Sequence, residues 1–188
     1  MSTLERLKII KDALGTDYVL IEVASLSIED DCYGGCTAVV CISHPSRVAV
    51  KLEEGGGIGM VDAIFDSFKR HFVKEYISLA GLSVYDFRVS KSDKKDSRGK
   101  HHCQIDLRID TDRGHNFEFS TTSHSLAAGS ARVVASAMEF FVNSEKAFVA
   151  LHRALSDAKE RGRSDLVTRY TRELAEVVRS TNYESVVP

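Results

Sequence analysis

The stretch "GGGIGMVDAIFDSFKRHF", residues 55–72, joins a glycine cluster to a strongly patterned helix. Three runs rich in β-branched residues precede it within residues 17–54, separated by the turn signals "DDCYGG" and "HPS". Apolar side chains then recur at spacings of three and four residues, which is typical of a helix that buries one broad face. These side chains are Val61, Ile64, Phe65, Phe68 and Phe72. The sequence therefore predicts a unit of three strands followed by one helix.

The same order of patterns recurs in the second half of the chain. The runs "LSVYDFRVSK", "HHCQIDLRID" and "HNFEFSTT" are strand-like, and "HSLAAGSARVVASAMEFFVN" is helical. When the two helix starts are aligned, Gly59 corresponds to Ser123 and Ala63 to Ala127, an offset of 64 residues. An internal repeat predicts pseudo-twofold architecture. We expect an α+β fold of two βββα units, at about residues 18–80 and 81–144, with any ligand between them.

Two further segments flank this double βββα module, which spans residues 18–144. Residues 1–17 are expected to form an N-terminal helix, because their apolar side chains share one helical face. Residues 145–188 carry two helical stripes with a turn at Gly162, so we expect a helical hairpin. This C-terminal extension must bury its stripes against the main domain or against another chain, and the sequence leaves both open.

The composition favours a cytoplasmic protein. The 25 basic and 27 acidic residues nearly cancel, so neither nucleic acid nor a membrane surface is an expected partner. No apolar run reaches the roughly 18 residues of a membrane span. The four cysteines lie partly within strand-like runs and are expected to be reduced thiols.

The glycine cluster does not match a phosphate-binding loop. It lacks the required lysine, and Asp62 in the first helical turn would repel a phosphate. Two interpretations stay open. The glycines could form a turn with positive φ. Alternatively, bare backbone at Gly57 and Gly59 could admit a ligand carboxylate to the helix N–H groups, while Asp62 pairs with the ammonium group of the same ligand.

Histidines and cysteines suggest neither a metal site nor an active site. His101 and His102 are neighbours in a predicted strand, so their side chains point to opposite faces, and no carboxylate spacing completes a ligand set. Neither a G-x-S-x-G nor an H-E-x-x-H motif occurs. We expect no metal, no cofactor and no catalytic residue.

Three motifs carry a resemblance to a known family. The segment Gly57 to Ala63 resembles a G-x-G-P-V-D-A helix start, Asp86 to Val89 resembles D-Y-R-V, and Ser123 to Ser130 resembles S-x-N-I-I-x-A-S. With its βββα context, the region from residue 18 to about residue 150 resembles the C-terminal regulatory (allosteric, dimerisation) domain of 2-isopropylmalate and citramalate synthases. That domain is built from two βββα units.

The resemblance implies a homodimer that binds a branched-chain amino acid, leucine or isoleucine, near the dimer interface, as in the control of leucine biosynthesis. Only 17 residues precede the region, so the catalytic barrel of these synthases is expected to be absent. The implied role is non-catalytic, with a separate synthase catalytic subunit as a partner. The implied ligand-binding residues are Gly57, Gly59, Val61, Asp62, Val84, Phe87, Ser123 and Leu126.

The chain departs from the family pattern at both helix starts. Met60 stands where the family has proline, and "STTS" at residues 120–123 replaces a usual glycine. These departures favour an alternative: a structural or protein-interaction module that kept the dimeric scaffold and lost the ligand pocket.

Overall fold

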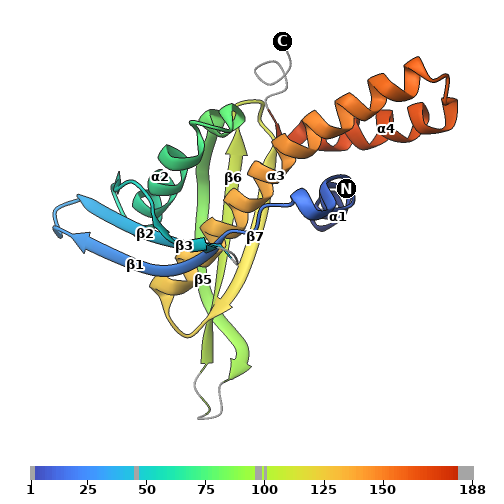
Figure 1. Cartoon of the computed structure of the whole chain (residues 1–188). Helices are drawn as coiled ribbons and strands as arrows, with labels where there is room; N and C mark the ends of the chain where they lie inside the picture. Colours follow the sequence, from blue (N-terminus) through green and yellow to red (C-terminus); the bar gives the residue numbers. More distant parts are fainter. Residues whose placement is uncertain (1–2, 45–46, 96–98, 100, 182–188) are drawn as a thin grey trace.

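The computed structural model describes residues 3–44, 47–95, 99 and 101–181 (Figure 1). Within them the chain has an α+β fold with two antiparallel sheets and four α-helices, as the sequence predicts at this coarse level. The elements are α1 (Thr3–Leu14), β1 (Glu22–Asp30), β2 (Cys36–His44), β3 (Arg47–Lys51), β4 (Gly55–Gly57), α2 (Met60–Phe72), β5 (Leu82–Lys95), β6 (His101–Thr111), β7 (Asn116–Ser123), α3 (Leu126–Glu160) and α4 (Ser164–Val177). Short 3-10 helices span Gly15–Asp17, Ile77–Gly81 and Val178–Ser180.

The first sheet has the order β1-β2-β3, and the short strand β4 also pairs with β2. β3 pairs with one end of β2, where Cys41 lies opposite Lys51. β4 pairs with the other end, where Cys36 lies opposite Gly57. Part of the predicted glycine loop is therefore a strand. This strand, β4, consists of glycines, which have no side chains from which a strand could be predicted. It is recognised by its backbone pairing with β2.

The second sheet has the order β5-β6-β7. Ile105, Leu107 and Ile109 alternate along β6 and are fully buried, whereas Asp106 and Arg108 between them lie on the opposite face. This alternation is the pattern of a strand with one face on the core and the other toward solvent. The three strands predicted for the second half of the chain are confirmed.

Each sheet is covered by a helix. α2 lies on β2 and β4, and α3 lies on β6 and β7 while also contacting α2 and β1 (Figure 1). The core includes the rings of Phe117, Phe140 and Phe141, whose centroids lie 5.2 to 5.4 Å apart. Phe68 and Ile64 of α2 are fully buried in the same core. Burial of each such side chain contributes about 1.5–3 kcal/mol to folding.

α3 is 35 residues long and continues through residue 145, the expected start of the C-terminal extension. Asn143 and Ser144 favour helix ends in many contexts, yet both are buried here. Asn143 bonds to both backbone groups of Val19, and Ser144 donates to the carbonyl of Phe140. α4 folds back along α3, and this hairpin projects away from the two sheets (Figure 1).

Candidate functional site

The strand before α2, which the sequence singles out, packs closely on that helix at two of its glycines. A methyl group added at Gly55 would overlap the backbone of Ala63 and Ser67. A methyl group at Gly57 would lie 2.5 Å from Cβ of Asp62 and 2.7 Å from the nitrogen of Ala63. The bare backbone of β4 is thus used for close contact with α2. The side of Gly57 that faces α2 is therefore occupied, whereas no atom of the described residues beyond its chain neighbours lies within 4 Å of the position that a methyl group at Gly59 would take.

The glycines of this segment do not adopt positive φ. The interpretation of the cluster as a turn with positive φ is therefore wrong. The glycines instead form the extended strand β4, which is followed by the N-cap of α2. Gly59 is the N-cap of α2, with φ −148°, and its carbonyl accepts a hydrogen bond from Ala63 at 3.0 Å. Close packing is the reason for glycine in β4.

Asp62 is exposed, and a different acid contacts the glycine backbone. Gly56 donates its N–H to Oδ2 of Asp66 at 3.0 Å, and Arg70 donates to the same oxygen at 2.6 Å. Asp66 is absent from the predicted site. Its spacing of four residues from both Asp62 and Arg70 is the signal that could have identified it, since such residues share a helical face.

The predicted apolar residues of the pocket are mostly packing residues. Val61, Val84 and Phe87 are half-buried against the core, and Leu126 is 42% exposed. Val84 and Phe87 lie opposite Ile109 and Leu107 in the β5–β6 ladder, so they extend the buried face of the second sheet.

The start of α3 is organised around Ser123, which is buried at the end of β7. Its Oγ accepts a hydrogen bond from Nη2 of Arg132 at 2.6 Å and another from the backbone N–H of Ser125 at 3.1 Å. Ser125 is the N-cap of α3, and its Oγ accepts from Ala128 at 3.3 Å. Ser123 therefore fixes Arg132 beside the first turns of α3.

A cavity of about 500 Å³ opens next to Ser123, between the first sheet and the start of α3. β1 forms one wall, and the ends of β6 and β7 with the first turns of α3 form the other. The volume is in the range of small-molecule sites. The lining residues are Val23, Ala24, Ser25, Leu26, His102, Thr122, Ser123, His124, Ser125, Ala128 and Arg132.

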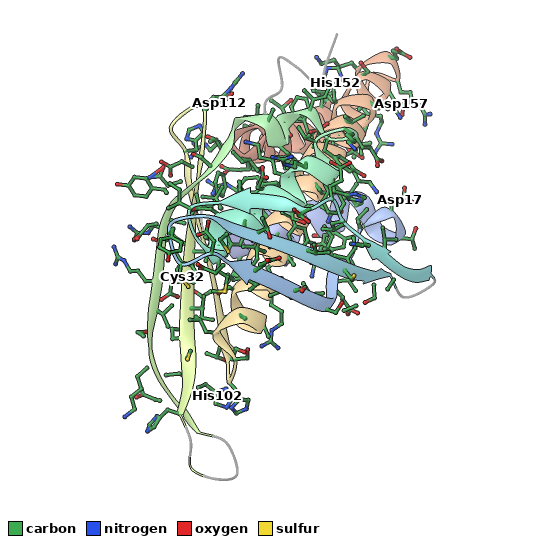
Figure 2. The ribbon with its side chains drawn as sticks, turned by 90° about the vertical axis from the view of Figure 1, so that its left-hand side faces the viewer. Asp17, Cys32, His102, Asp112, His152 and Asp157 are labelled. Atoms are coloured by element: carbon green, nitrogen blue, oxygen red, sulfur yellow. The ribbon has the colours of Figure 1, made fainter. Side chains whose placement is uncertain are left out.

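The polar part of this cavity is basic. The rings of His102 and His124 lie with their centroids 3.8 Å apart, and Arg132 is the third basic group. Nδ1 of His102 is buried, and it has no hydrogen-bond partner among the described residues. None of the described residues lining the cavity carries a carboxylate. Figure 2 shows His102 at the end of the second sheet, beside the first turn of α3. The arrangement can bind an anionic group.

Of the predicted residues, Ser123 lines this cavity, whereas Gly57, Gly59 and Asp62 belong to the separate start of α2. Arg132 and His124 are not among the predicted site residues, and the sequence argument about His102 concerns only a metal site. In the described part of the chain, no group of three or more His, Cys, Asp or Glu residues could hold a metal ion. The register, which pairs Cys103 with Ser123, explains how His102 and His124 come together across β6 and β7.

None of the helices in the described ranges has the length and apolar character needed to cross a membrane. No protein-family model matches the chain, and no curated protein matches its sequence. The candidate site is therefore defined by its geometry: a cavity lined by three basic side chains, between β1 and the start of α3.

Proposed function

We propose that this chain is a non-catalytic regulatory-type domain that binds a small acid, a branched-chain amino acid or a related carboxylic acid, at the start of α3. The observation that supports this most strongly is the cavity beside Ser123, with Arg132, His102 and His124 on its polar side. A guanidinium group recognises a carboxylate through paired N–H donors. Each charge-assisted hydrogen bond contributes about 1.5–3 kcal/mol.

The apolar side of the cavity suits a short branched side chain. Val23 and Leu26 of β1 are half-buried, so part of each side chain is available for contact with a ligand. The small side chain of Ala128, on the opposite side, leaves room for a ligand. An acid with a few apolar carbons would place its carboxylate toward Arg132 and its tail toward the apolar side chains of β1.

The finer architecture is part of the same proposal. β5-β6-β7 are followed by α3, and β1-β2-β3 are followed by the additional short strand β4 and then α2. Apart from β4 the two halves share the order of three strands and a helix, which supports two βββα units related by a pseudo-twofold axis. By its resemblance to the synthase regulatory domains, the chain would form a homodimer in the cytoplasm and regulate a separate synthase subunit when its ligand binds.

Isothermal titration calorimetry tests the binding proposal. Leucine, isoleucine, valine and their 2-oxo acids are titrated into the protein, and at least one should bind. Arg132→Gln should weaken that binding by about tenfold or more, since it removes a charge-assisted contact. Arg172→Gln removes an exposed arginine from α4 and serves as the matched control. Absence of binding by every acid in the panel would contradict the proposal.

The second candidate is a structural or protein-interaction module without a ligand. The packing of β4 on α2 favours it, because the chain's own helix occupies one side of Gly57 in the motif that resembles the family's ligand site. Ile58, beside that start, is 83% exposed and could contact a second copy. Under this alternative, Ile58→Glu would dissociate the dimer in light scattering while every acid fails to bind. An unchanged oligomeric state would argue against it.

A further inference from the structure

The cavity beside Ser123 at the start of α3 is called the α3 cavity below. The charges around it limit the class of ligand that it can bind. We propose that this cavity selects a carboxylic acid that lacks an ammonium group, a 2-oxo or 2-hydroxy acid with a short branched tail, over the corresponding amino acid. This inference rests on the proposed function, since it assumes that the cavity binds a small acid. It adds a prediction of which acid binds and why.

An amino acid needs two opposite partners, and the cavity offers only one kind. Arg132, His102 and His124 can hold a carboxylate, but the ammonium group of an amino acid would lie among basic groups. No acidic side chain is found among the lining residues that the structure describes. Beside Arg132 an ammonium group is repelled by a like charge, and it finds no carboxylate with which to form a charge-assisted hydrogen bond. The zwitterion therefore binds more weakly than an acid of the same shape with a neutral 2-substituent.

The start of α3 differs in charge from the other helix starts. α1, α2 and α4 each carry an acid in the first turn, namely Glu5, Asp62 and Asp165, whereas α3 has none. A helix N-terminus carries a partial positive charge, which an acid normally offsets. At α3 the partial positive charge of the helix N-terminus adds to the positive charge of Arg132. Arg132 lies eight residues after His124 in the chain. The electrostatic field in the cavity thus favours a net anion.

Hydroxyl groups in the cavity suit a neutral oxygen beside the carboxylate. Ser25 and Thr122 line it from β1 and β7, and a hydroxyl both donates and accepts hydrogen bonds. A 2-oxo oxygen can accept from such a group, and a 2-hydroxyl can do either. Ser123 is already engaged by Arg132 and Ser125, so it orients the arginine and is a positioning residue.

Calorimetry with matched ligands tests the selectivity. The probes are 4-methyl-2-oxopentanoate, 2-hydroxy-4-methylpentanoate and leucine, which share one carbon skeleton. The 2-oxo or the 2-hydroxy acid should bind at least about tenfold more tightly than leucine. If leucine binds as tightly or more tightly, the inference is wrong while the proposed function stands. If none of the three binds, and the remaining acids of the panel also fail, the proposed function itself is wrong.

Ala128→Asp provides an independent test that adds the missing partner. Ala128 is exposed in the first turn of α3 and lines the cavity, and an acid is favourable at this position of a helix. The variant should shift the ratio of affinities toward leucine by about tenfold, because the new carboxylate can pair with the ammonium group. The new carboxylate also lies four residues before Arg132 and can pair with it, which weakens the binding of every acid, so the readout is the ratio of affinities and not the affinity itself. Ala128→Asn is the matched control for size, and should keep the preference of the unaltered protein. An unchanged ratio in a folded Ala128→Asp protein would contradict the inference.

Discussion

The starts of α2 and α3 each follow the last strand of a sheet, but they differ in how closely the neighbouring strand packs on the helix and in the charge of the first turn. At α2, the glycines of β4 lie in direct contact with the helix, and Asp62 occupies the first turn. At α3, Ser123 holds Arg132 in place, and a cavity remains between the helix and β1. A glycine cluster before a helix is therefore not by itself a ligand site, since the neighbouring element decides whether its surface stays open.

The largest expected effect on stability concerns the packing of β4 on α2. Gly55→Ala should destabilise the protein by about 3 kcal/mol, because the added methyl group overlaps the backbone of Ala63 and Ser67. Gly56→Ala in the same strand is the matched control, since nothing lies within 4 Å of the position its methyl group would take. Urea unfolding of both variants measures the difference. Equal free energies of unfolding would show that β4 does not pack on α2 in this way.

The next effect concerns how β1 is held beside α3. Asn143 is fully buried, and its side chain bonds to the N–H and the carbonyl of Val19, just ahead of β1. Asn143→Ala should cost about 1–3 kcal/mol, because it leaves the half-buried N–H and carbonyl of Val19 without their partner. It should also weaken acid binding, since β1 forms a wall of the cavity. Ser136→Ala, at an exposed position of α3, controls for changes in the helix itself. A fully stable Asn143→Ala protein would contradict this account.

A smaller effect on stability is expected from a substitution on the outer face of the second sheet, away from both helix starts. Hydrogen bonds from Ser120 and then Gln104 hold the pKa of Asp106 below its ordinary value. A depressed carboxyl pKa in the folded state stabilises the protein above the unfolded-state pKa of about 4 and loses that contribution as the pH falls through the folded value. Asp106→Asn should therefore be less stable than the unaltered protein at pH 7 by less than about 1 kcal/mol.

The measurement is chemical unfolding of both proteins at pH 7 and again near pH 3. The difference should shrink at the lower pH, because the carboxyl group of the unaltered protein becomes protonated there. Acid binding at pH 7 should be the same in both proteins, since Asp106 does not line the α3 cavity. A difference in stability that grows as the pH falls would show that the sign of the pKa shift is wrong.

Local patterns identify much of the fold. The alternation of Ile105, Leu107 and Ile109 predicts a half-buried strand, and the spacing of Ile64 and Phe68 predicts the buried face of α2. β4 escapes such reasoning, because three glycines have no side chains to form a pattern and the strand exists through its pairing with β2. The continuation of α3 past Asn143 also depends on a distant partner, Val19.

The candidate site could be predicted only in part. Ser123 is a site residue that the resemblance to the synthase regulatory domains implies, and it does line the cavity. The cavity itself requires β1 to lie along α3, a contact between segments about 100 residues apart in the chain. His102 and His124 become neighbours only through the register of β6 with β7. Long-range register of this kind leaves no local pattern in the sequence.

The most direct test of the account compares acid binding by two single variants, one at each helix start. The probe is 4-methyl-2-oxopentanoate, titrated by calorimetry into the unaltered protein, Arg132→Gln and Asp62→Asn. The account predicts that Arg132→Gln loses about tenfold or more in affinity, because it removes a charged donor from the cavity, while Asp62→Asn binds as the unaltered protein does. Loss of binding in Asp62→Asn with full affinity in Arg132→Gln would place the ligand at α2 and contradict the account.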